Sequence, residues 1–259
     1  KHEEDAVRKN VALADLGESI KLDGKNADAY YEHGNALYDK RDYDHAIADL
    51  NQAINIKPDY TAAFNVRGLA YNGKGDSDRA IADFDQALRI DPKFAAALSN
   101  RGDAYQKKRN FERAIADFDE AIKANPNYAN AYFSRGLVNQ DKRDYQRAVA
   151  DFTRVIKLDA KNAAAYNARG SSYLSLNDEE RAFSDFDHAI KLNASYGAAY
   201  YNRGMAYYQR RSYDRAIADL SHAIRLDPND ALAAYGRGLA YRDRRDFDRA
   251  TQDINQAIK

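Results

Sequence analysis

Few side chains in this chain could do chemistry, and they are widely separated. Cysteine is absent from the 259 residues, which excludes disulfides, thiolate metal sites and cysteine nucleophiles. The five histidines lie outside any motif for a nucleophile or a metal site: His2, His33, His45, His188 and His222. His188 and His222 occupy equivalent places in successive repeats, but two ligands are too few for a closed zinc site. We therefore predict no catalytic residue, no metal and no cofactor.

Two other segments have the composition of a chemical site but not its spacing. Residues 73–76 read Gly-Lys-Gly-Asp, and they lack the second Gly-Lys-Ser/Thr step that a phosphate-binding loop requires, so they indicate a turn. The acidic run Asp178, Glu179 and Glu180 is typical of the start of a helix, where negative charge is favourable. We interpret both segments as structural.

Charge and hydropathy exclude several classes of partner. Lys plus Arg and Asp plus Glu both number 40, giving a formal net charge of zero, whereas a general polyanion binder gains its affinity from clustered cations. No apolar run approaches the length of a membrane span. We expect a soluble chain of the cytoplasm or the bacterial periplasm that binds neither nucleic acid nor membrane. Because Lys1 is not a translational start, we also expect a processed or truncated N-terminus.

The elements that must position any site follow a fixed period of 34 residues. A glycine recurs at this step without insertion or deletion: Gly34, Gly68, Gly102, Gly136, Gly170, Gly204 and Gly238. An alanine keeps the same step: Ala46, Ala80, Ala114, Ala148, Ala182, Ala216 and Ala250. A period in this range indicates a repeat architecture in which each unit buries its apolar faces against its neighbours.

Each period reads as two amphipathic helices joined by a tight turn. The first helices are predicted to begin at seven residues: Ala27, Thr61, Ala95, Ala129, Ala163, Gly197 and Ala231. The recurring glycine lies inside the first helix, where glycine is unfavourable, so another helix must approach too closely for a side chain. Proline ends the second helix at Pro58, Pro92, Pro126 and Pro228.

This pattern resembles the tetratricopeptide repeat, in which a bulky residue stands four before the glycine and a tyrosine three after it, followed by alanine, an aromatic residue and proline. In the third copy these are Leu98, Gly102, Tyr105, Ala114, Phe118 and Pro126. The resemblance implies an all-α, right-handed superhelical solenoid of antiparallel helix pairs. Residues 27–259 are predicted to form seven repeats in one continuous solenoid. Residues 1–26 form a partial repeat, with an orphan second helix at Val7–Leu22.

One departure from the family pattern is systematic, because a charged residue precedes the glycine. It is arginine in six copies and histidine in the first: Arg67, Arg101, Arg135, Arg169, Arg203, Arg237 and His33. The second helices carry an aspartate: Asp49, Asp83, Asp117, Asp151, Asp185, Asp219 and Asp253, with Asp15 in the partial repeat. Unpaired charges among apolar residues would be very costly, so we infer Arg–Asp pairs, within or between repeats. We favour a structural role for these pairs, and the alternative is that the charged residues form an acidic or basic row that binds a partner.

The opposite face of the first helices needs no partner inside the repeat. We call the fifth, ninth and twelfth positions of these helices the groove face, which the family resemblance places on the concave surface. Tyr, Met and Arg are enriched at protein interfaces, and Asn can bind an extended backbone. The predicted peptide-binding residues are Tyr31, Asn35, Tyr38, Asn65, Leu69, Phe133, Leu137, Asn167, Tyr201, Met205, Tyr208, Tyr235, Leu239 and Arg242. The alternative is that some of these rings pack against adjacent helices.

These residues predict a non-catalytic protein–protein interaction scaffold that binds a peptide or protein segment in a concave groove. The carboxylate clamp of chaperone-tail readers in this family is matched only at Asn35, so we predict a different mode. A first alternative is a homo-oligomer formed through uncapped terminal faces, where Ile254 and Ile258 are apolar. A second is a single-stranded RNA binder, which the zero net charge disfavours.

Overall fold

In a computed structural model that describes residues 13–258, the described chain is helical and has no strand. The first helices of the repeats are α2 (Ala27–Asp39), α4 (Thr61–Gly73), α6 (Ala95–Lys107), α8 (Ala129–Asp141), α10 (Ala163–Ser175), α12 (Gly197–Gln209) and α14 (Ala231–Asp243). The second helices are α3 (Tyr43–Ile56), α5 (Ser77–Ile90), α7 (Phe111–Ala124), α9 (Tyr145–Leu158), α11 (Glu179–Leu192), α13 (Tyr213–Leu226) and α15 (Phe247–Ile258). The predicted all-α fold of paired helices is confirmed, with every first helix beginning at its predicted residue.

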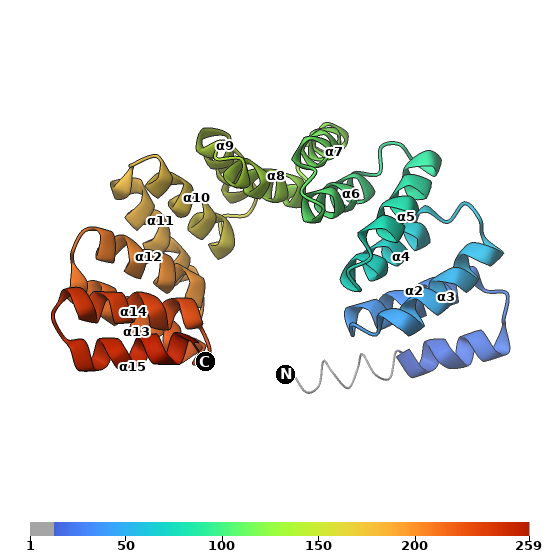
Figure 1. Cartoon of the computed structure of the whole chain (residues 1–259). Coiled ribbons are helices and arrows are strands. Elements are labelled where there is room, and N and C mark those ends of the chain that lie inside the picture. The colour runs from blue at the N-terminus through green and yellow to red at the C-terminus, as the bar shows by residue number, and fades with distance from the viewer. Residues whose placement is uncertain (1–12, 259) are drawn as a thin grey trace. The chain divides into compact units, whose positions relative to one another are not determined.

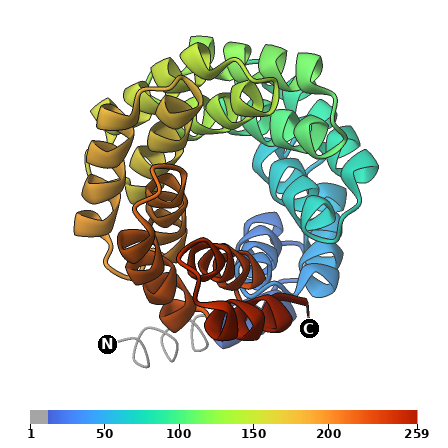
Figure 2. The same cartoon turned by 60° about the vertical axis from the view of Figure 1, so that its left-hand side comes forward.

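The helices belong to two compact units, Lys1–Ser134 and Arg135–Lys259, and the division falls within α8. In each unit the first and second helices form two layers (Figures 1 and 2). Second helices pack against their own first helices in the pairs α2–α3, α4–α5, α6–α7, α10–α11, α12–α13 and α14–α15. They also pack against the first helix of the next repeat at α3–α4, α5–α6, α9–α10, α11–α12 and α13–α14. A helix also covers residues 13–22, and the rest of the predicted orphan helix lies outside the described residues. The single continuous solenoid stays a prediction.

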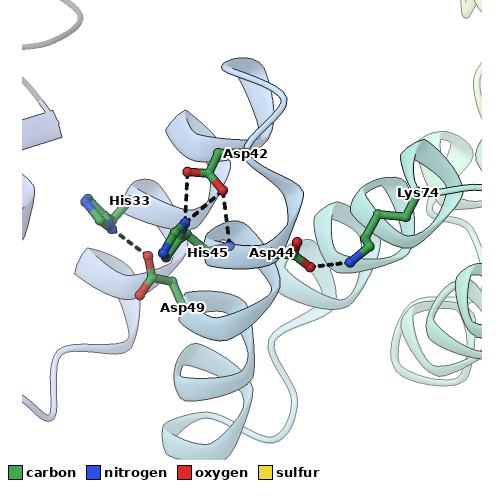
Figure 3. A network of polar contacts seen from close by, with 6 residues as sticks. All are labelled: His33, Asp42, Asp44, His45, Asp49 and Lys74. Carbon is green, nitrogen blue, oxygen red and sulfur yellow. Dashed lines mark hydrogen bonds and ion pairs between the residues drawn. The ribbon is translucent and has the colours of Figure 1, made fainter.

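The turn inside each repeat is built by backbone and capping hydrogen bonds. After α2, the Asp42 amide donates to the Leu37 carbonyl and the Arg41 amide to the Tyr38 carbonyl, the pattern that ends a helix with a left-handed residue. Asp42 then caps α3 by accepting from the His45 amide, and its side chain also bonds the His45 ring (Figure 3). These local bonds explain why a helix ends and the next begins within three residues.

The recurring glycine marks the closest approach of the two helices of a repeat. Phe118 is fully buried on α7, and its Cε1 atom lies 2.6 Å from where a Cβ at residue 102 would be. Phe84, Phe152 and Phe186 fill the equivalent places of their own repeats. The glycine is therefore required by contact with a buried ring.

The Arg–Asp pairs form within a repeat. Arg169 donates from Nε and Nη2 to the two carboxylate oxygens of Asp185, both at 2.8 Å. Its remaining Nη1 donates to Thr153 Oγ1 on the second helix of the preceding repeat at 3.1 Å. Hydrogen bonding to Asp185 raises the pKa of Arg169, which stays charged. One guanidinium thus joins three consecutive helices.

The same arrangement recurs along both units. The acceptors on the preceding repeat are Asn51 for Arg67, Asp85 for Arg101, Asp187 for Arg203 and Ser221 for Arg237. The aspartates lie in the same repeat as their arginines: Asp83, Asp117, Asp151, Asp185, Asp219 and Asp253. In the first repeat, His33 Nδ1 lies 2.5 Å from Asp49 Oδ2 (Figure 3). The pairs therefore connect helices within a repeat, and the third N–H group connects repeats.

We expect Gly102→Ala to lower the free energy of unfolding by about 1–3 kcal/mol, because the buried Phe118 ring has no space to move away from a new methyl group. Gly197→Ala is the control, since the nearest atoms to its added Cβ, on Leu226, lie 3.9 Å away. Urea unfolding of both variants measures the difference. Equal stabilities would contradict the close-approach explanation.

We expect Arg169→Ala to lower the free energy of unfolding by about 3–5 kcal/mol, because it leaves the buried Asp185 carboxylate unpaired. The double variant Arg169→Met with Asp185→Leu should recover most of the loss, since both buried charges are removed. Thermal unfolding compares the three proteins. Wild-type stability together with loss of partner binding would instead assign Arg169 to recognition.

Candidate functional site

The groove face of the first unit carries half-buried rings. Tyr31 packs against Tyr60 with ring centroids 5.0 Å apart, and Tyr38 packs against Tyr43 at 5.9 Å. Burial is the main cause that raises the pKa of Tyr31 and Tyr38. Part of each ring is thus used in packing, as the alternative interpretation of the sequence anticipates, and part is accessible. Asn35, Leu69 and Phe133 are also half-buried.

Two predicted groove-face asparagines link neighbouring repeats. Asn65 is 8% exposed and its side-chain oxygen accepts from Asn100 Nδ2 at 2.8 Å. Asn167 is equally buried and accepts from Asn202 Nδ2 at 2.9 Å. Peptide binding by Asn65 and Asn167 stays a prediction, but their carbonyl oxygens are engaged within the fold. The sequence signal for this role is an asparagine at the fifth position followed 35 residues later by a second asparagine.

The second unit gathers the largest cluster of predicted site residues, on α12 and α14. We call it the C-terminal patch, and it consists of Tyr201, Met205, Tyr208, Tyr235, Leu239 and Arg242. Tyr201 and Met205 pack on the core of this unit, and burial raises the pKa of Tyr201. The Met205 sulfur lies 2.8 Å from where a Cβ at Gly236 would be, so α14 approaches α12 closely here. Tyr235, in contrast, is 49% exposed.

One carboxylate organises the polar end of the C-terminal patch. The Tyr208 hydroxyl donates to Asp243 Oδ2 at 2.8 Å, and Arg242 Nε donates to Asp243 Oδ1 at 2.8 Å. The hydrogen bond from Arg242, reinforced by the one from Tyr208, lowers the pKa of Asp243. Asp243 is therefore ionised at neutral pH and orients the guanidinium. Asp243 is not among the residues predicted from the sequence, although its position beside Arg242 was the available signal.

The remaining predicted residues of the groove face are less exposed than Tyr235. Leu137 and Leu239 are half-buried, on α8 and α14. Gln140, also on α8, donates to the Ala168 carbonyl and to Ser172 Oγ. The groove face of the second unit therefore combines apolar side chains with polar groups that are already held in place.

The four histidines among residues 13–258 take part in local packing, capping and pairing. His188 stacks on Tyr166 with ring centroids 5.4 Å apart, and His222 stacks on Tyr200 at 4.0 Å. Among the described residues no three His, Cys, Asp or Glu side chains converge on a possible metal position. Within the same part of the chain, no helix is long and apolar enough to cross a membrane. The C-terminal patch thus offers aromatic rings, a methionine and an oriented guanidinium for noncovalent contact with a partner.

Comparison with known families gives a consistent match. A tetratricopeptide repeat model matches residues 8–61, 31–95, 65–127, 99–140 and 139–197. A second model with the same description matches residues 197–230. No curated protein sequence matches the chain.

Solved structures share the fold at low sequence identity. YrrB, described as a TPR protein with an unusual peptide-binding site, is 21% identical, with 73% of this chain and 97% of that chain covered and a TM-score of 0.55. MamA is 28% identical, with 61% and 92% covered and a TM-score of 0.54. pilF of Pseudomonas aeruginosa is 17% identical, with 86% and 99% covered and a TM-score of 0.71.

We expect Arg242→Ala to raise the pKa of Asp243 toward the usual value of about 3.9, and Tyr208→Phe to raise it less, because Arg242 has the larger effect. The sign follows from the lowered pKa: the Asp243 contribution to stability is present above the unfolded-state pKa and is lost as the pH falls through the folded-state pKa. Carboxyl-carbon NMR titration of the three proteins measures this. An unchanged titration in Arg242→Ala would contradict the arrangement.

Proposed function

Because the chain belongs to the tetratricopeptide repeat family, whose fold scaffolds protein–protein interactions, we propose that it binds an extended peptide or protein segment along its groove face and performs no catalysis. The observation that carries this proposal is the C-terminal patch. There an exposed Tyr235 ring stands on the same helix as the oriented Arg242 guanidinium, beside half-buried Tyr201 and Met205. Tyr, Met and Arg are the residue types enriched in interface cores.

The C-terminal patch offers a partner an exposed aromatic ring, a rigid apolar surface and a positive charge. Tyr235 has about half of its surface available, so a partner that covers the ring gains apolar contact at little cost in side-chain entropy. Tyr201 and Met205 pack against the core, so they form a rigid apolar surface beside Tyr235. Arg242 is fixed by Asp243 and presents its remaining N–H groups to an acceptor on the partner. The peptide-binding site described for YrrB supports this mode by analogy of fold.

Self-association is a second candidate, favoured by a specific observation. Phe247 and Ile258 on α15 are 63% and 77% exposed, which is unusual for large apolar side chains. Covering them with a second copy would remove this apolar surface from water. Light scattering across a concentration series distinguishes the candidates, because an invariant monomer mass disfavours association. The single-stranded RNA alternative predicts strong salt-dependent binding, which the zero net charge disfavours.

We expect Tyr201→Ala with Tyr235→Ala to weaken partner capture by about 30-fold or more, because aromatic anchors at interface centres typically contribute about 2 kcal/mol or more. Capture by the intact chain followed by mass spectrometry identifies the partner, and titration with that partner gives the affinity. Leu226→Ala is the matched control, since Leu226 is 38% exposed on α13, outside the groove face. Unchanged capture by the tyrosine variant would place the site elsewhere.

A further inference from the structure

The turn between the two helices of every full repeat contains one residue with a left-handed backbone. The residue is arginine in five repeats, glycine in one and asparagine in one: Arg41, Gly75, Arg109, Arg143, Asn177, Arg211 and Arg245, with φ between 58° and 83°. Glycine adopts this conformation without a steric penalty and asparagine tolerates it, whereas a long side chain is disfavoured. The backbone therefore gains nothing from arginine, and its repeated presence indicates a role for the side chain.

We call the five residues Arg41, Arg109, Arg143, Arg211 and Arg245 the turn arginines. All five are exposed, and none of their guanidinium groups makes a hydrogen bond or an ion pair with another described residue. One ring contact is present, between the Arg109 guanidinium and Phe111 at 5.6 Å. Arg211 also lies near Asp243 and helps to lower its pKa, but that carboxylate is already bonded by Tyr208 and Arg242.

The cation that precedes the left-handed residue behaves differently. It forms an ion pair with the second helix of the preceding repeat, as in Lys74–Asp44, Lys108–Asp78, Arg210–Glu179 and Arg244–Asp214. Figure 3 shows the first of these pairs. Two adjacent cations in one turn thus have separate roles, because the first joins repeats and the second is left unpaired.

The acidic side chains of these turns are already engaged in the second unit. Asp214 pairs with Arg244, and Asp246 pairs with Arg249 while also accepting from its amide. Arg211 and Arg245 line two shallow hollows on successive repeats. A carboxylate brought to either hollow would meet an unpaired guanidinium.

We propose that the turn arginines of each unit form a second docking surface, separate from the groove face, for an acidic polypeptide segment whose Asp and Glu carboxylates pair with the guanidinium groups. Guanidinium groups bind carboxylates through two parallel hydrogen bonds. Two residues after each turn arginine stands an aromatic side chain: Tyr43, Phe111, Tyr145, Tyr213 and Phe247. The repeats with Gly75 and Asn177 carry Ser77 and Glu179 instead. Arginine and ring therefore occur together, and the exposed Phe247 ring beside Arg245 offers apolar contact to a peptide as well as charge.

A polypeptide fits this surface better than a nucleic acid. An aspartate follows the turn arginine in three of the five turns, at Asp42, Asp144 and Asp246, and it would repel a continuous row of phosphates. The Tyr43 and Tyr213 rings already pack against Tyr38 and Tyr208, which hinders stacking on bases. Discrete carboxylates spaced along a flexible chain can avoid these aspartates.

The test removes the arginine side chains without straining the backbone. Arg211→Gly with Arg245→Gly places glycine where the backbone is left-handed, so the melting temperature should be unchanged or higher. Asn177→Gly is the control at an equivalent turn without a turn arginine. The probe is a fluorescent peptide of alternating Glu and Ser, with a Gln-for-Glu peptide as its neutral match. Anisotropy is measured at low and physiological ionic strength, alongside a single-stranded RNA and vesicles containing phosphatidylserine.

We expect the acidic peptide to bind the wild-type protein, the neutral peptide not to bind, and salt to weaken the binding. The double glycine variant should lose affinity by about fivefold per arginine, with Asn177→Gly unaffected. Unchanged affinity in the double variant would overturn the proposal. A lower melting temperature in that variant would also overturn it, because the arginines would then be structural. Tighter binding of RNA or vesicles, lost in the same variant, would assign the surface to a different anion.

Discussion

The repeats after the first depend on a guanidinium that bonds the second helices of its own and the preceding repeat. Arg169 is typical. It donates hydrogen bonds from Nε and Nη2 to Asp185 of its own repeat and from Nη1 to Thr153 of the preceding repeat. The pair is largely shielded from water, with side-chain exposures of 16% and 6%. A buried pair of this kind is stabilising only when its geometry and its remaining hydrogen bonds are satisfied. The interaction therefore specifies the register of three helices more than it adds to stability.

This constraint leaves the opposite side of each first helix available. The seventh position of the first helix carries the arginine and the eighth the glycine, so that arc faces the second helices of its own and the preceding repeat. The fifth, ninth and twelfth positions then lie on another arc, where Tyr235 is exposed and Tyr201 is half-buried. The groove face is accordingly a consequence of the way that the Arg–Asp pairs fix the helices.

Charged residues fall into three groups with different environments. The half-buried arginines of the Arg–Asp pairs join helices, and the cations at the ends of the first helices form surface ion pairs between repeats. The turn arginines have unpaired side chains among the described residues. Surface ion pairs contribute little individually, so Lys74–Asp44 and its equivalents chiefly align adjacent turns. The net charge of zero therefore does not describe the turns, because most acidic groups beside them are paired within the protein while the turn arginines are not.

The sequence by itself determined the period, the start of every first helix and the presence of an Arg–Asp pair in each repeat after the first. These features depend on local periodicity and on the cost of burying an unpaired charge. Only the tertiary structure decided that Asp185 is the partner of Arg169, that Asn100 and Asn202 bond the asparagines of the preceding repeat, and that Tyr208 and Arg242 meet at Asp243. Which side chains bond to one another depends on which helices lie side by side, and the spacing of residues along the sequence is compatible with several such pairings. The left-handed turn arginines were missed for a related reason, since arginine has no intrinsic preference for that conformation and adopts it only because the hydrogen bonds of the turn impose it.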